Sequence, residues 1–237
     1  MKVFTIITAG GSGTRMNAEK RKQYIDIGNK PVIAHTVNKF QVTDTVDEIV
    51  LTAPEQDIDS VRKNIIEKYN FYKVIHIFPG GDTRQDSVFE ALKNMKADPD
   101  DIILIHDGVR PFISHEIITE CIRSLDHCDC SVTGIRPVNT IKSLSAGQIC
   151  STLDRNSLVS VQTPQTFKYG FILKCHEAAK RDNFTATDDS ALAEKYGQEI
   201  LGREPVIRVV AGSSLNIKIT DPNDLIIASA LLEHLSI

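Results

Sequence analysis

Short apolar runs alternate with longer segments of helical periodicity along the first half of this chain. The runs predict buried strands at Val3–Thr8, Glu48–Ala53, Lys73–Phe78, Ile102–His106 and Ser131–Ile135. The segments between them predict helices at Pro31–Phe40, around Ile58–Tyr69, around Val88–Met95 and at Ser114–Leu125, the last capped by Ser114. This alternation predicts an α/β, Rossmann-like fold with a mostly parallel sheet and helices on both faces.

The pattern changes between Pro137 and Arg155. Two short β-prone runs, Thr140–Lys142 and Ile149–Thr152, flank a turn of small and polar residues. This arrangement predicts a β-hairpin. Because a lone hairpin is unstable in water, it must either pack on its own domain or project and grip a second subunit.

The α/β pattern resumes in the last third of the chain. It predicts a helix at Tyr169–Lys180, a helix capped by Thr187, strands at Val206–Val210 and Leu215–Ile219, and a last helix with Pro222 at its first position. We expect a single domain over residues 1–237, with 137–155 as a protruding β-arm.

Composition narrows the possible partners and surroundings. The 237 residues are 41% hydrophobic and 24% charged, which is ordinary for a soluble globular protein. The net charge of −4 disfavours nucleic-acid binding, and no apolar stretch reaches the ~20 residues of a membrane span. We expect a cytoplasmic protein, because the chain runs directly into a strand without a signal peptide and its five cysteines are an odd number.

A glycine-rich loop, Ala9–Met16, follows the first predicted strand. Its glycines allow the backbone N–H groups to approach an anion closely, and Arg15 and Lys22 flank it with positive charge. Together they indicate a nucleotide triphosphate site, although a tight turn with solvated charges is the alternative. The dinucleotide fingerprint would need glycine at Met16, and the Walker pattern is absent, so neither known loop accounts for it.

Other polar segments also follow strands, where ligands bind in parallel sheets. Gly80–Ser87 offers glycine backbone and polar side chains that suit hydrogen bonding to the edge of a base. The alternative is that this segment only forms a turn and caps a helix. Asp107 stands at the end of a buried strand, and its carboxylate suits a Mg²⁺ ion that also binds phosphates. The alternative is that Asp107 only forms an ion pair with Arg110. Lys218 lies amid apolar neighbours and becomes functional only if its segment faces the pocket.

The order of several segments resembles the 2-C-methyl-D-erythritol 4-phosphate cytidylyltransferases, enzymes of isoprenoid biosynthesis. The segments are Ala9–Met16 with Lys22-Gln23, Gly80–Val88, His106–Phe112, Pro137–Lys142, Leu153–Asn156, Val161–Phe167, Thr187–Leu192 and Asn216–Leu225. Ribitol 5-phosphate cytidylyltransferases share the loop, Asp-x-x-Arg-Pro and Thr-Pro-Gln. The segments at Thr140–Lys142, Leu153–Arg155 and Thr187–Ser190 are more similar to the methylerythritol enzymes.

The resemblance implies a role for each candidate residue. For CTP binding, it implies that the triphosphate is wrapped by Ala9, Gly10, Gly11 and Gly13, and that cytosine is recognised by Gly81, Asp82 and Ser87. For catalysis, it implies that the phosphates are neutralised by Arg15, Lys22 and Lys218. It implies that Asp107 holds Mg²⁺ and that, with Arg110, Thr140, Arg155 and Thr187, it lies around the methylerythritol phosphate. It also implies a homodimer in which the arm carrying Thr140 and Arg155 crosses to the partner.

The expected reaction is Mg²⁺-dependent transfer of CMP from CTP to the polyol phosphate, with release of pyrophosphate. The attacking phosphate oxygen is already anionic, so no general base is needed. The alternatives are the ribitol 5-phosphate enzyme, a nicotinamide-dependent oxidoreductase and a non-catalytic nucleotide sensor. In one departure from the family, Arg21 stands where proline often precedes the loop lysine, which predicts a less fixed approach of Lys22.

Overall fold

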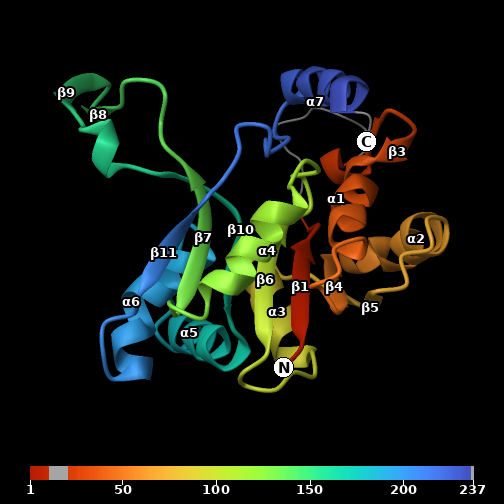
Figure 1. Ribbon diagram of the computed structural model, residues 1–237, viewed down its shortest axis with the longest axis horizontal. Coiled ribbons are helices and arrows are strands. Elements are labelled where there is room, and N and C mark those ends of the chain that lie inside the picture. The colour runs from red at the N-terminus through yellow and green to blue at the C-terminus, as the bar shows by residue number, and fades with distance from the viewer. Residues whose placement is uncertain (11–20, 236–237) are drawn as a thin grey trace.

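The fold is built on one central sheet (Figure 1). The computed structural model describes residues 1–10 and 21–235, and in this part the sheet has seven strands in the order β11-β7-β10-β6-β1-β4-β5. The strands are β1 (Val3–Thr8), β4 (Glu48–Ala53), β5 (Val74–Pro79), β6 (Ile102–Asp107), β7 (Cys130–Ile135), β10 (Ser160–Lys168) and β11 (Ile207–Ala211). The first five strand predictions are confirmed, to within about one residue at each end.

The direction of β10 distinguishes it from its neighbours. It pairs antiparallel with both β6 and β7, whereas the pairs β1·β4, β1·β6, β4·β5 and β11·β7 are parallel. The chain leaves the sheet at the end of β7, forms the arm and re-enters at the same end. Since the returning strand starts where the previous one stopped, it must run the opposite way. The predicted mostly parallel sheet is therefore confirmed.

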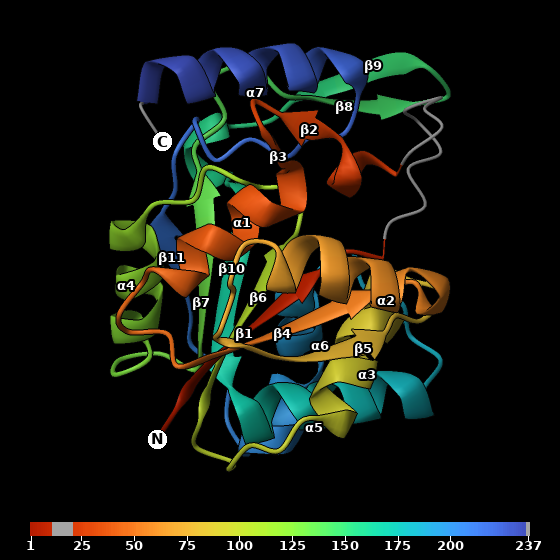
Figure 2. The same cartoon turned by 90° about the vertical axis from the view of Figure 1, so that its right-hand side faces the viewer.

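Helices cover both faces of the sheet (Figure 2). One face carries α1 (Val32–Gln41), α2 (Ile58–Val61), which continues as the π-helical η4 (Arg62–Glu67), and α4 (His115–Ser124). The other face carries α3 (Arg84–Asn94), α5 (Tyr169–Arg181) and α6 (Asp189–Leu201). The short elements are η2 (Lys22–Tyr24), β2 (Asp26–Ile27), β3 (Lys30–Pro31), η3 (Glu55–Asp57) and η5 (Arg155–Ser157).

Apolar side chains fill both sandwich layers. Phe40 of α1 lies in the first layer, and Phe4 and Phe167 lie in the second, all completely or almost completely buried. Each such side chain contributes about 1.5–3 kcal/mol through burial. A third, smaller cluster packs α7 (Pro222–Leu235) through Ala228 against Phe112 and the β2 region. This cluster lies beyond the carboxyl end of β6 and closes one side of the site described below.

Two predictions for the last third of the chain are wrong. The residues from Leu215 to Ile219 form no strand, because their backbone is bonded to loops across the strand ends: Asn216 O accepts from Arg110 Nη1 at 2.8 Å, and Ile219 N donates to Val109 O at 2.9 Å. The cap of α6 is Asp188 and not Thr187, since the Asp188 carboxylate accepts from Ala191 N at 3.0 Å. The cap at Ser114 and the position of Pro222 are confirmed.

The predicted hairpin consists of β8 (Lys142–Ser145) and β9 (Gln148–Thr152). Ala146 and Gly147 between them both have positive φ, as the tightest hairpin turns require. The hairpin projects from the body of the molecule (Figure 1), and its Leu144 and Ile149 are each 66% exposed. It therefore does not pack back on its own sheet, and its role in dimerisation stays a prediction.

Candidate active site

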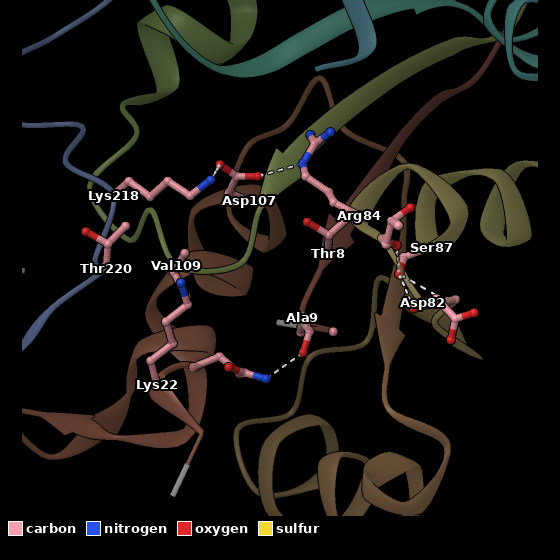
Figure 3. Close-up of a pocket in the computed structure, with 14 residues that line it drawn as sticks. Thr8, Ala9, Lys22, Asp82, Arg84, Ser87, Asp107, Val109, Lys218 and Thr220 are labelled. Atoms are coloured by element: carbon pink, nitrogen blue, oxygen red, sulfur yellow. Dashed lines mark hydrogen bonds and ion pairs between the residues drawn. The ribbon is translucent and has the colours of Figure 1, made fainter. Parts of the chain in front are cut away.

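A cavity of about 360 Å³ opens at the carboxyl ends of β1 and β6 (Figure 3). Eight of the predicted site residues line it: Ala9, Gly10, Lys22, Gly81, Asp82, Ser87, Asp107 and Lys218. The remaining predicted residues of the glycine loop, Gly11, Gly13 and Arg15, lie outside the described residues. Segments up to about 200 positions apart in the sequence thus meet at one edge of the sheet, as parallel strand ends predict.

The loop that follows β1 is anchored where it leaves the strand. Ala9 N donates to Thr52 O at 2.8 Å, and Ala9 O accepts from Gln23 Nε2 at 2.6 Å. Gln23 is buried and belongs to the same short helix as Lys22, so this bond holds the lysine at the cavity wall. Arg21, the residue in place of the family's usual proline, forms an ion pair with Asp57 at 3.3 Å, which ties the segment to η3.

The loop between β5 and α3 is held in shape by hydrogen bonds to its own side chains. Ser87 Oγ accepts from Gly81 N at 3.1 Å and donates to Thr83 O at 2.9 Å, while Thr83 caps α3. Gly81 must be glycine, because a Cβ there would lie 2.4 Å from the Cβ of Asp86. The Ser87 hydroxyl is thus used to hold the loop, and Asp82 lies exposed at the cavity edge.

Asp107 lies at the centre of the site, surrounded by three cations. Its Oδ1 accepts from Arg84 Nε at 2.9 Å, and its Oδ2 accepts from Lys218 Nζ at 2.9 Å (Figure 3). The same Oδ2 also accepts from Arg110 Nε at 3.3 Å. Burial would raise the pKa of Asp107, but Arg84, Lys218 and Arg110 outweigh it and hold this pKa well below its usual range. The expected ion pair with Arg110 is present, but it is one of three.

A neutral histidine supports the base of this cluster. His106 is completely buried, with Nδ1 3.0 Å from Thr163 Oγ1 and Nε2 3.1 Å from Arg110 O. Burial lowers its pKa to about 4, despite the opposing effect of the Arg110 carbonyl. Thr163 also accepts from Asp107 N at 3.1 Å, so β10 fixes the end of β6.

A second cavity of about 420 Å³ adjoins the first. It is lined by Arg84, Asp107, Arg110, Val159, Val161, Gln162, Thr163, Gln165, Thr187, Asp188 and Lys218. Arg84, Asp107 and Lys218 line both cavities and form a charged wall between them. Arg110 and Thr187, for which the resemblance implies contact with the acceptor, both line this cavity, and that role stays a prediction.

The two predicted residues of the arm lie elsewhere. Thr140 and Arg155 line neither cavity of their own chain. Arg155 is exposed, and its Nη1 donates to the Val138 carbonyl at 2.8 Å. Within one chain, therefore, neither of these two arm residues reaches the charged wall.

The prediction missed Arg84, which contacts two carboxylates at the site. Its Nη1 donates to Asp189 Oδ2 at 2.7 Å in addition to the bond from Nε to Asp107. Burial lowers the pKa of Arg84, but Asp189 and Asp107 outweigh it and raise this pKa above its usual value. Both Arg84 and Asp189 belong to segments singled out in the sequence, but no role at the site was predicted for either side chain.

The described residues contain no group of three or more His, Cys, Asp and Glu side chains placed to hold a metal. Asp107 offers one carboxylate at the wall shared by the two cavities, and Mg²⁺ accepts one or two carboxylates together with oxygens of phosphate and water. Over residues 1–10 and 21–235, no helix combines the length and apolar character needed to cross a membrane.

Comparison with known proteins identifies the family of this chain. The family model for 2-C-methyl-D-erythritol 4-phosphate cytidylyltransferase matches residues 3–234. This chain belongs to that family. A family member from Clostridium botulinum strain 657 is 43% identical over 98% of this chain and 97% of its own length. A member from Geotalea uraniireducens is 38% identical over 100% of this chain and 99% of its own length.

A solved structure of the family has the same fold. The 4-diphosphocytidyl-2C-methyl-D-erythritol synthase from Anaerococcus prevotii superposes with a TM-score of 0.82 at 34% identity, covering 98% of this chain and 96% of that one. Membership of this cytidylyltransferase family identifies the chain as a nucleotidyltransferase. It thereby removes the support for the oxidoreductase alternative, which rested on the glycine loop.

Proposed function

We propose that this protein transfers the cytidylyl group of CTP to 2-C-methyl-D-erythritol 4-phosphate, releasing pyrophosphate, in isoprenoid precursor biosynthesis. The observation that carries the proposal is the charged wall of Arg84, Asp107 and Lys218 shared by two cavities. A transfer between two bound substrates needs two sites that meet where charge develops, and this wall is such a place.

The cavity beside β1 is the proposed CTP site. The start of the glycine loop, with Ala9 and Gly10, lies on one side, where backbone N–H groups suit the triphosphate. Gly81 and Asp82 lie on the other side and suit the hydrogen-bonding edge of cytosine, while Ser87 holds that loop in shape. Lys22 extends along the cavity wall (Figure 3), where its ammonium suits the phosphates.

The adjoining cavity is the proposed site of the acceptor phosphate. Arg110 and Thr187 lie in it and offer a guanidinium and a hydroxyl to an anionic, hydroxyl-bearing substrate. An oxygen of the acceptor phosphate attacks the α-phosphorus of CTP, a new P–O bond forms, and the bond to the β-phosphate oxygen breaks as pyrophosphate leaves. The nucleophile is anionic at neutral pH, so no residue has to remove a proton.

Positive side chains provide most of the proposed catalysis. The negative charge that develops during in-line transfer is proposed to be stabilised by Lys22, Lys218 and Arg15, the last of which belongs to the glycine loop. Lys218 borders both cavities and is paired with Asp107, so it can contact phosphate from either substrate.

Asp107 is the proposed residue that would hold Mg²⁺. When bound, the ion would supply charge neutralisation between this carboxylate and the phosphates of CTP. The single carboxylate and the absence of a larger acidic group among the described residues support an ion held mainly by substrate oxygens.

The arm supports a composite site in a homodimer. Thr140 and Arg155 lie on or next to a hairpin that projects away from its own cavities, and Leu144 and Ile149 on it expose apolar surface. We propose that the arm covers the partner subunit and brings these two residues to its acceptor cavity. A cytoplasmic location and the lack of nucleic-acid and membrane partners stay predictions from composition.

Pyrophosphate release with CTP and a panel of polyol phosphates tests the proposal. We expect turnover with methylerythritol phosphate to exceed turnover with ribitol 5-phosphate at equal concentration. Faster turnover of the ribitol compound would favour the alternative enzyme. Binding of CTP without pyrophosphate release from any acceptor would indicate a nucleotide sensor.

A further inference from the structure

We propose that Asp189, which lines neither cavity, is a positioning residue that orients Asp107 through Arg84. This inference rests on the proposed function, because it assigns a purpose to the charged wall. The three side chains form a continuous bridge from the start of α6, over the start of α3, to the end of β6. Asp189 Oδ2 accepts from Arg84 Nη1 at 2.7 Å, and Arg84 Nε donates to Asp107 Oδ1 at 2.9 Å.

The far end of the bridge is rigidly enclosed. The Asp189 side chain is 1% exposed, and its other oxygen lies 3.4 Å from Nε2 of the equally buried His176. The His176 ring in turn stacks on Phe89, with ring centroids 6.0 Å apart and planes at 1°. Asp189 thus cannot turn away from Arg84 without disturbing packed side chains.

The carboxylate of Asp189 is not required as a helix cap. Asp188 already caps α6, through its bond from Ala191 N. Arg84 is the first residue of α3, where the helix dipole disfavours a cation, and much of its guanidinium is removed from water. Two carboxylates offset these costs, and removing either one would leave Arg84 held at a single end.

The bridge holds one Asp107 oxygen, while Lys218 and Arg110 bond the other. With Oδ1 bonded to Arg84, Oδ2 is directed to Lys218 at the boundary of the two cavities (Figure 3). If Arg84 loses its anchor, its guanidinium can rotate and Asp107 can shift with it. A displacement of about 1 Å at a reacting centre can cost on the order of 10²-fold in rate.

The test compares four variants with the wild-type enzyme. Asp189→Asn removes the anchoring charge without changing size. Arg84→Lys keeps the cation but removes the planar guanidinium, whose separate N–H groups hold the two carboxylates in a fixed geometry. The third variant combines both changes. Asp101→Asn is the matched control, because Asp101 is also a buried carboxylate but binds the Lys2 and Asp98 N–H groups at the opposite end of β6.

Two readouts are measured for each variant. The first is the kinetics of pyrophosphate release, for which we expect kcat to fall about 10²-fold in Asp189→Asn, with the KM for CTP within about threefold of wild type. The double variant should be no slower than Arg84→Lys, because Asp189 acts only through Arg84. The second is the ¹⁵N–¹H signal of Arg84 Nε, assigned by its loss in Arg84→Lys, which should exchange slowly in wild type and in Asp101→Asn but broaden in Asp189→Asn.

The proposal requires both results. It is overturned if kcat is unchanged in Asp189→Asn, if the Arg84 signal persists there, or if the two substitutions reduce kcat multiplicatively. Should Asp189→Asn not fold, Arg84→Lys must itself show the fall in kcat at unchanged KM, and a wild-type rate would refute the bridge. If the wild-type enzyme releases no pyrophosphate, the proposed function fails, whereas the Arg84 signal still decides whether Asp189 holds the arginine.

Discussion

Restoration of activity by mixing two inactive variants tests whether each active site takes residues from two chains. Lys22 lines the proposed CTP cavity of its own chain, whereas Arg155 lies at the end of the projecting arm and lines neither cavity of its own chain. If the arm reaches the partner, each site combines Lys22 of one chain with Arg155 of the other. We therefore expect Lys22→Ala and Arg155→Ala to complement each other when unfolded together and refolded.

The magnitude follows from two-fold symmetry. Random pairing of equal amounts gives about half the dimers as mixed dimers. In a mixed dimer, one site carries both defects and the other carries none, so half of its sites are intact. Activity should therefore rise to roughly one quarter of the wild-type value, from the near-zero level of either variant.

A matched mixture distinguishes this result from a general effect of refolding. Lys22 and Asp107 line the same cavity of one chain, so a mixture of Lys22→Ala with Asp107→Asn leaves every site with at least one defect. That mixture should stay inactive. If native mass spectrometry shows mixed dimers but the Arg155→Ala mixture is no more active than this control, the arm serves its own subunit and the composite site is refuted.

Three further predictions concern charge and packing. Lys22→Ala should lower kcat by about 10²–10³-fold, because it removes a cation aimed at the transition state, whereas a rise in KM for CTP at constant kcat would limit Lys22 to ground-state binding. Asp107→Asn should abolish most activity while retaining the circular-dichroism spectrum, and near-wild-type rates at low Mg²⁺ would leave Asp107 only its role of holding the loop. Phe167→Ala should lower the free energy of unfolding by about 3–5 kcal/mol in urea titration, since Phe167 is completely buried, and a loss under 1 kcal/mol would contradict its place in the core.

The sequence by itself determined the features that depend on near neighbours in the chain. Alternating apolar runs and helical spacing located most of the helices and the sheet strands β1, β4, β5, β6 and β7. Ser114 and Pro222 marked two helix starts, because a cap or an N-terminal proline acts within one turn. The glycine turns and the polar residues after strands pointed to the edge of the sheet where the two cavities lie. The ordered set of motifs identified the family.

The tertiary structure decided what depends on residues distant in the chain. Residues 215–219 have the apolar pattern of a strand, but part of their backbone bonds within a turn and part bonds to the β6–α4 loop, so they cross the site as a loop. For Asp107 the sequence left open a Mg²⁺ ligand or an ion pair with Arg110, three residues away, and it did not predict the further bonds to Lys218 and Arg84. The bond from Arg84 to Asp189 spans 105 positions. No local periodicity encodes such a pair, because only the packing of α3 and α6 on the same face of the sheet brings the two charges together.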